Sequence, residues 1–261
     1  MGVTAEIGDR EVATIVMCDP SGRNALDARL RQALADELLR LQQHDGVRAI
    51  VIAAETGNFS VGGDLSQIAD HVAGQEAHRT MRSAGQLALL AGLSPKPLVA
   101  AVSGHCLGAG AGLALLCDFI VMGKGATIGF PFLKVGLVAD FGISYTLPQR
   151  IGTPAARRAL MEARTFTAEE ALTIGLADAV VEDDAIRNAA LAQARRLAEA
   201  PAEALLQLRL MLREPPTNLA SALQSEALHQ SICLGSADMH EGVSAFREKR
   251  KPDFIGTAAK A

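Results

Sequence analysis

The sequence predicts an α/β fold in which strands and helices share a core over residues 1–200 and helices alone fill residues 201–261. Three observations predict it. Short apolar runs alternate with helical patterns in the first half of the chain, helical patterns dominate after Asp140, and 24 glycines mark turns between elements. At 261 residues the chain can bury a large hydrophobic core without disulfides or metals to stabilise it.

The first predicted elements are two strands with a helix between them. Residues 12–17 are apolar and β-branched, which predicts a strand, and 49–53 predict a shorter strand that is apolar throughout, as in a sheet covered on both faces. Leucines at positions 30, 34, 38 and 41 recur at helical spacing. Asp27 can cap the helix that they predict over 27–43.

Glycine-rich turns separate the elements that follow. A helix is predicted from Asp64 towards Leu93, where a proline-containing segment ends it. Strands are predicted at 98–102 and 119–122, with a glycine-rich turn and a helix between them. Later helices are expected at about 141–150, 153–163, 167–174, 184–199, 201–212, 217–234 and 237–249.

Composition and charge narrow the class of function. Hydrophobic residues make up 49% and charged residues 21% of the chain, which is ordinary for a soluble globular protein. The net charge is −4, and Lys and Arg are concentrated only in 247–251, so we expect no nucleic acid partner. The four cysteines show neither metal-ligand nor disulfide spacing, so we expect no metal and a reducing, cytoplasmic compartment.

One segment has the length of a membrane span. Residues 97–117 carry no charge, but they include Ser103, His105 and four glycines. A buried strand, a glycine-rich turn and a buried helix explain this run better. We therefore expect no membrane association.

The chain has three glycine-rich segments. One of them could offer backbone N–H groups to a ligand, and another could offer a carboxylate. Gly62 and Gly63 precede Asp64, and such a pair exposes N–H groups and lets a ligand approach closely; alternatively, Asp64 caps a helix after a plain turn. In another segment, Asp140 stands alone among apolar residues. Desolvation would raise its pKa and suit it to act as a base on carbon, whereas its alternative role is to cap the next helix.

The remaining segment, 98–112, admits several interpretations. Its glycine spacing does not fit a dinucleotide-binding fingerprint. The turn 104–108 matches a nucleophile elbow with Cys106 as the nucleophile. An acid and a histidine would complete that site, for which the chain offers Asp178, His229 and His240. As an anion cradle, the helix that follows the turn would direct its first N–H groups at a developing negative oxygen.

Taken together, these segments resemble the crotonase superfamily, that is, the enoyl-CoA hydratase/isomerase family. The resemblance covers nearly the whole chain, and its motifs occur in the family's order. They are SGRNALD at 21–27, FSVGGDL at 59–65, VSGHCLGAG at 102–110, LLCD at 115–118, VGLVAD at 135–140, FTAEEALTIGLAD at 166–178 and EGVSAFREKRKPDF at 241–254.

The resemblance implies a crotonase-like spiral of β-β-α repeats followed by a helical C-terminal trimerisation region. It implies homotrimers or dimers of trimers. The apolar stripe of Leu205, Leu208 and Met211 would then contact another subunit, although it could equally pack on the protein's own core. It also implies acyl-CoA thioester ligands, in which coenzyme A is part of the substrate and no separate cofactor is needed.

The resemblance also implies where the site lies. In this family two backbone N–H groups hold the thioester oxygen, and the matching positions here are Gly63 and Ala109. The coenzyme A and the rest of the substrate would lie near Arg23, Ala25, Ser60, Gly62, Asp64, Leu65 and Phe132. Typical hydratases use two glutamates, whose positions fall here on Gly112 and Phe132, and neither can transfer a proton.

This leaves Asp140, in a segment similar to those of dienoyl-CoA and epoxyphenylacetyl-CoA isomerases. One base can take a proton from one carbon and return it to another. We therefore expect an acyl-CoA isomerase of fatty acid metabolism that shifts a double bond or opens a ring, with Asp140 as its base. The alternatives are an enoyl-CoA hydratase, which is a lyase, and a non-catalytic acyl-CoA-binding protein. A dehalogenase-like use of Asp140 would need a histidine where this chain has Gly85.

Overall fold

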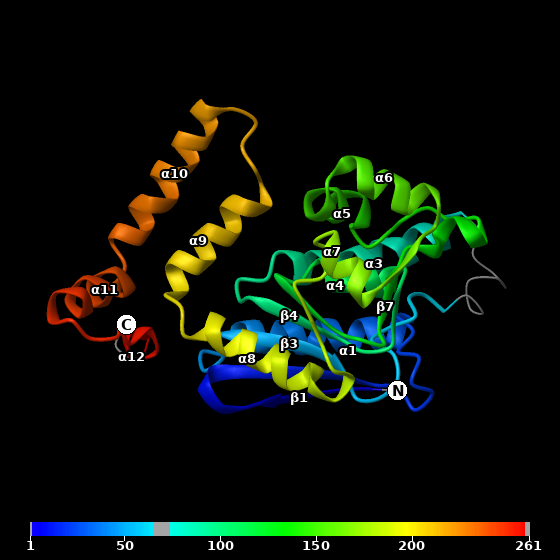
Figure 1. The fold of residues 1–261 in the computed structure, drawn as a ribbon, viewed down its shortest axis with the longest axis horizontal. Helices are drawn as coiled ribbons and strands as arrows, with labels where there is room; N and C mark the ends of the chain where they lie inside the picture. Colours follow the sequence, from blue (N-terminus) through cyan, green and yellow to red (C-terminus); the bar gives the residue numbers. More distant parts are fainter. Residues whose placement is uncertain (1, 65–73, 259–261) are drawn as a thin grey trace. The chain divides into compact units, whose positions relative to one another are not determined.

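The computed structural model describes residues 2–64 and 74–258 (Figure 1). Contacts divide the chain into two compact units, Met1–Ala194 and Arg195–Ala261. The first unit combines strands and helices and the second contains helices, which confirms the predicted α/β fold class. Leu65, one of the predicted substrate contacts, lies outside the described residues.

A mainly parallel sheet forms the centre of the first unit. In the part of the chain that the structure describes, its strand order is β1 (Gly2–Ile7), β2 (Val12–Cys18), β3 (Ala49–Ala54), β4 (Leu98–Val102), β6 (Phe119–Gly123) and β9 (Ala179–Val181). β1 pairs antiparallel with β2, and the other neighbours pair in parallel, with Val12 opposite Ala49 and Val99 opposite Phe119. β4 is buried along its whole length, as expected for a strand covered on both faces.

A smaller sheet includes part of the segment 98–112. Its strands are β5 (His105–Leu107), β7 (Thr127–Gly129) and β8 (Thr165–Thr167); β5 runs parallel to β7, which is antiparallel to β8. The sequence analysis missed these strands, together with β1 and β9. β5, β7, β8 and β9 have three residues each, too few to show periodicity, whereas the six residues of β1 are not apolar enough to mark a buried strand.

Helices connect the strands and cover them. Asp27 accepts a hydrogen bond from the N–H of Leu30 at 2.8 Å, which confirms the predicted cap of α1 (Ala28–Gln43). The next helices are α3 (Gln75–Gly92), α4 (Ala109–Leu115), α5 (Ile143–Ile151), α6 (Thr153–Met161), α7 (Ala168–Thr173) and α8 (Ile186–Ala198). Short 3-10 turns lie at Asp9–Glu11 (η1), Pro131–Val135 (η2) and Asp183–Ala185 (η3). α5 packs against α4 and α6 (Figure 1).

The second unit contains α9 (Ala202–Arg213), α10 (Leu219–Leu234), α11 (Ala237–Glu248) and α12 (Phe254–Ala258). α9 and α10 contact each other and run in opposite directions as a hairpin (Figure 1). Asn218 caps α10 by accepting a hydrogen bond from the N–H of Ser221 at 2.9 Å. Large apolar side chains on these helices are exposed, among them Leu212, Leu219, Leu228 and Phe246.

The uncharged run 97–117 folds as β4, β5 and the seven-residue helix α4. This agrees with the interpretation as a buried strand, a turn and a buried helix. Within residues 2–64 and 74–258, no helix combines the length and the apolar character needed to cross a membrane.

Candidate functional site

The first two glycine-rich segments run side by side. The N–H of Ser60 donates to the carbonyl of His105 (3.1 Å), and the N–H of Leu107 donates to the carbonyl of Ser60 (2.9 Å). Gly62 has a positive φ of 90°, and a Cβ atom there would lie 2.7 Å from the carbonyl oxygen of Leu107 and 3.3 Å from the amide nitrogen of Ala109. Glycine therefore allows a backbone approach that a side chain would block.

Two backbone N–H groups lie where these segments meet. Ala109 is the first residue of α4, so its N–H has no acceptor within the helix, and Gly108 before it has a positive φ of 53°. Gly63 follows Gly62 at the facing turn. Among the described residues, no hydrogen bond engages the backbone N–H of Gly63 or Ala109. Such donors can stabilise negative charge that develops on a substrate oxygen.

Buried hydrogen bonds brace the turn at Gly62. The Ser60 hydroxyl donates to the carbonyl of Asn24 (2.7 Å) and accepts from the N–H of Gly62 (3.1 Å). The N–H of Leu26 donates to the carbonyl of Gly62 (2.8 Å). Ser60 is fully buried, so its hydroxyl holds two parts of the backbone together.

The other predicted contact residues lie around the same turn. Ala25 is buried, Arg23 is exposed, and the carbonyl of Arg23 accepts a hydrogen bond from the N–H of Val61 (3.0 Å). Gly63 and Asp64 are partly exposed. The structure therefore brings segment 23–26 and segment 60–64 together, as a bound substrate that touches both would require.

Helix α4 is wholly buried and contacts two other segments through its glycines. A Cβ atom on Gly110 would lie 2.6 Å from the Cβ of Ser60, and one on Gly112 would lie 2.7 Å from the Cβ of Phe141. Real Cβ atoms essentially never approach other atoms so closely. An acidic side chain at position 112 would therefore need space that Phe141 already occupies. Phe132, in η2, is also buried, and its ring lies 3.7 Å from the position of a Cβ atom on Gly108.

Asp140 is a half-buried carboxylate between η2 and α5. Its Oδ1 is buried and has no hydrogen-bond partner in the part of the chain described. Burial raises the pKa of Asp140 above its ordinary value, while its own backbone N–H and the charge of Arg31 oppose that rise. Such a carboxylate suits a base that takes protons from carbon. The capping alternative is wrong, because the N-cap of α5 is Gly142 and no side chain caps it.

The sequence predicted neither Arg31 as a neighbour of Asp140 nor the backbone conformation of Phe141, a phenylalanine that could line the pocket or pack in the core. Arg31, on α1, donates from Nη1 to the carbonyl of Leu26 (2.7 Å). Burial lowers the pKa of the Arg31 guanidinium, while the charges of Asp27 and Asp140 raise it. Phe141 is 5% exposed and has a positive φ of 53°. The available signals were an arginine within a stripe of buried leucines and a bulky residue directly before a glycine.

Cys106 does not fit the nucleophile of an elbow. It lies in β5 and is fully buried, and burial raises the pKa of its thiol well above the ordinary value. A reactive cysteine needs an accessible thiolate. Asp178, one of the partners considered, accepts a hydrogen bond from the N–H of Ile120 (2.7 Å) and pairs with Arg150. The hydrolase interpretation is therefore excluded.

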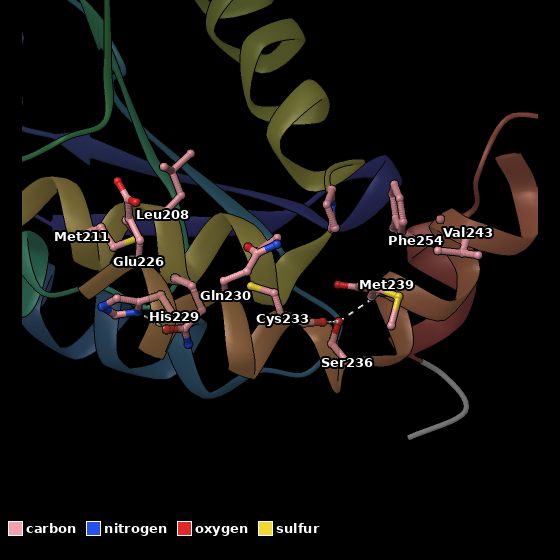
Figure 2. A pocket seen from close by; sticks show the side chains of 15 residues that line it. Leu208, Met211, Glu226, His229, Gln230, Cys233, Ser236, Met239, Val243 and Phe254 are labelled. Atoms are coloured by element: carbon pink, nitrogen blue, oxygen red, sulfur yellow. Dashed lines mark hydrogen bonds between the residues drawn. The ribbon is translucent and has the colours of Figure 1, made fainter. Parts of the chain in front are cut away.

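A cavity of about 720 Å³ lies within the second unit (Figure 2). Apolar side chains such as Leu208, Met211 and Val243 line it, and His229 hydrogen-bonds to Gln207 beside it. Its lining residues all belong to 201–254, and none is a predicted site residue. In the described part of the chain, His, Cys, Asp and Glu side chains nowhere gather in threes as metal ligands would.

An α/β core followed by a helical C-terminal unit is the architecture of the crotonase superfamily. Residues 8–257 match the family described as Enoyl-CoA hydratase/isomerase, so the chain belongs to this family.

Two curated relatives from Escherichia coli (strain K12) span nearly the whole chain. The 2,3-dehydroadipyl-CoA hydratase is 32% identical over 248 residues, which cover 95% of this chain and 96% of the relative. The 1,2-epoxyphenylacetyl-CoA isomerase is 30% identical over 252 residues, with coverages of 95% and 96%. The crystal structure of an enoyl-CoA hydratase from Polaromonas sp. JS666 matches with a TM-score of 0.90 at 27% identity, over 97% of this chain and 99% of that chain. Both activities thus occur in the names of similar proteins, and hydratase is the more frequent name.

Proposed function

We propose that this chain is an acyl-CoA isomerase that shifts a double bond or opens a ring, with Asp140 as its base. The strongest support is the set of residues around α4. Asp140 is a half-buried acid with a raised pKa, whereas the positions that match the two hydratase glutamates hold Gly112 and Phe132. One base is sufficient for a proton shift, but the usual addition of water to a double bond uses two acids.

The proposed reaction moves one proton between two carbons. With a 3-enoyl-CoA, the Asp140 carboxylate removes a proton from the α carbon, and the released electron pair moves through the carbonyl group onto the thioester oxygen. The N–H groups of Gly63 and Ala109 donate to that oxygen and stabilise the enolate. The enolate then collapses, the double bond moves to the α–β position, and the Asp140 carboxyl returns the proton to the γ carbon.

We propose that the coenzyme A portion lies along segments 23–26 and 60–65. Its contacts would be Arg23, Ala25, Ser60, Gly62, Asp64 and Leu65, with Ser60 acting through the backbone that its hydroxyl holds. Phe132 and Phe141 are buried beside α4 and would keep water away from the enolate. Coenzyme A enters as part of the substrate, and the reaction needs no other cofactor.

The test is turnover of a 3-enoyl-CoA, a 2-enoyl-CoA and an aryl epoxide CoA ester by wild-type protein and Asp140→Asn. We expect wild type to isomerise the 3-enoyl ester or open the epoxide, with negligible hydration of the 2-enoyl ester. Because general-base catalysis contributes about 10²–10⁴-fold, Asp140→Asn should lose that factor in kcat while it still binds the esters. Asp36→Asn, an exposed acid on α1, is the control and should leave kcat unchanged.

Two other outcomes would overturn the proposal. The second candidate, enoyl-CoA hydratase, is favoured by the names of more relatives, and it requires rapid hydration of the 2-enoyl ester that does not depend on Asp140. The third candidate, an acyl-CoA-binding protein, requires that all esters bind and none is converted.

We also propose that residues 201–261 assemble the chain into a homotrimer or a dimer of trimers. α10 buries none of its residues within the described structure, and Leu219 and Leu228 are 74% and 63% exposed. Apolar surface of this kind is typical of an interface between subunits. The free cysteines suit the reducing cytoplasm as the compartment of this assembly.

A further inference from the structure

The loop that carries Asp140 has a strained backbone. The next two residues both have left-handed conformations, Phe141 with a φ of 53° and Gly142 with a φ of 80°. Glycine adopts this conformation readily, but a bulky residue rarely does, because its Cβ atom crowds the neighbouring carbonyl. Phe141 therefore keeps this conformation only where its surroundings impose it.

The contact that imposes it lies at Gly112 of α4. The three atoms nearest to a Cβ atom on Gly112 would be the Cβ of Phe141 (2.7 Å), the carbonyl oxygen of Phe141 (3.2 Å) and Cγ1 of Ile143 (3.3 Å). All three belong to the segment after Asp140. This segment therefore rests directly on α4, at a position where the helix has no side chain.

The same helix carries one of the proposed oxyanion donors. Ala109 opens α4, and Gly112 follows three residues later, about 4.5 Å along the helix axis. The Oδ1 of Asp140 has no hydrogen-bond partner among the described residues, so no neighbouring side chain fixes that oxygen. The position of the carboxylate must therefore be set by the backbone of its loop.

We propose that Phe141, seated on Gly112, is a positioning residue that holds the Asp140 carboxylate in register with the N–H of Ala109. The contact also restricts the site to one acid, because it fills the space that a side chain at position 112 would need. This inference rests on the proposed function. Proton transfer to an enolate requires the base and the oxyanion donors at a fixed separation, and a misplacement of about 1 Å can cost roughly 100-fold in rate.

The first test compares Phe141→Ala with Phe141→Leu and with Phe166→Ala, which removes the same atoms from a buried phenylalanine in β8. We expect Phe141→Ala to lose roughly 10- to 100-fold in kcat with the 3-enoyl ester, at an unchanged KM. Phe141→Leu should keep most of kcat, because it replaces the ring with another large apolar side chain, whereas Phe141→Ala keeps only the Cβ atom that touches Gly112. Phe166→Ala should lower Tm and leave kcat unchanged. An unchanged kcat in Phe141→Ala, or equal losses in both alanine variants, would overturn the proposal.

The second test is a double-mutant cycle across the contact. Gly112→Ala should lower kcat, because its Cβ atom displaces Phe141 and the loop with it. Phe141→Gly removes the Cβ atom that Gly112→Ala would meet. The double variant should therefore be no slower than Phe141→Gly alone, whereas losses that multiply would show that the two residues act independently.

The pKa of Asp140 can be measured without any enzymatic reaction. It therefore tests the positioning role of Phe141 independently of the proposed function. Two groups lower the pKa of Asp140, its own backbone N–H and the charged guanidinium of Arg31 on α1. Neither group changes in these variants. Removal of the Phe141 ring admits water, so the pKa of Asp140, measured by carboxyl ¹³C NMR, should fall toward its ordinary value in Phe141→Ala and stay unchanged in Phe166→Ala. An unchanged pKa in Phe141→Ala contradicts the positioning role. If the pKa falls but wild type converts none of the esters, the proposed function alone is wrong.

Discussion

The pKa of Asp140 is raised by the loss of water around its carboxylate and lowered by its own backbone N–H and by the charge of Arg31. Burial has the largest effect, so the pKa of Asp140 is raised overall. A base acts only when it is deprotonated. The rate of the proposed reaction should therefore decline as the pH falls through the raised pKa, at a higher pH than an exposed aspartate would give.

Substitution of Arg31 should shift the pH at which the rate declines. Arg31→Gln removes the cation that lowers the pKa of Asp140, so the acid limb of the kcat/KM profile should shift to higher pH. Arg31→Lys keeps the charge and should retain most of the wild-type profile. Arg29→Gln, an exposed neighbour on α1, serves as the control. A shift of the acid limb to lower pH in Arg31→Gln would contradict this account.

The sequence was sufficient to find Asp140 but insufficient to find its neighbours. A lone carboxylate in an apolar segment is unusual enough to be noticed by itself. Arg31 lies on a different helix and Phe141 owes its importance to Gly112, so both roles arise only where distant segments meet. No local pattern contains that information.

Among the elements of the fold, α4 connects the parts of the site. Its glycines allow close contact with Ser60 and with Phe141, and its first residue supplies a proposed oxyanion donor. The Ser60 hydroxyl in turn links two backbone groups that lie far apart in the sequence. A change in any of these contacts should therefore affect both stability and catalysis.

Ser60→Ala tests this connection. It leaves the carbonyl of Asn24 and the N–H of Gly62 buried without their partner, which should lower the free energy of unfolding by about 1–3 kcal/mol. The turn that carries Gly63 should also shift and lower kcat. Urea unfolding and steady-state kinetics measure both effects. Ser231→Ala removes an exposed hydroxyl that bonds to the carbonyl of Ala227 on α10, and it should change stability by less than about 0.5 kcal/mol. Equal effects of the two substitutions would refute the bracing role.

The elements differed in how well the sequence predicted them. The leucines of α1 recur at helical spacing, and β2, β3 and β4 are apolar runs that are buried almost throughout, so these patterns were sufficient. β5 and β8 were missed because three residues show no period and their stability comes from pairing with β7. The prediction that a helix follows the glycine turn in 98–112 is confirmed, since α4 begins at Ala109, and the anion-cradle role of this turn stays a prediction.

At the scale of the whole molecule, the two units differ in how much of their apolar surface they bury. The first unit buries a continuous apolar core, whereas α10 in the second buries none of its residues within the described structure. The order of seven short motifs along the chain was sufficient to predict the family. Assembly is harder to predict from a sequence, because an apolar stripe that packs on its own chain has the same pattern as one that packs on another subunit.

The proposed assembly can be tested through α10. Leu223→Glu combined with Leu228→Glu places two charges at exposed leucines of α10 and should reduce the mass in solution to that of a monomer. Light scattering or native mass spectrometry would measure it. Leu39→Glu, on an exposed part of α1, should leave the assembly intact. A wild-type protein that is monomeric at micromolar concentration would rule out the assembly.

The contact between Gly112 and Phe141 also constrains how this protein could evolve. A mutation that introduces glutamate at position 112 meets the Cβ of Phe141 and damages the site before any second acid can act. A glycine at position 141, which removes that Cβ atom, must come first, and by the proposed positioning role that step alone weakens the existing reaction. On the proposed positioning role, each change alone should lower activity, so we expect a fitness valley between this pair of residues and two-acid chemistry.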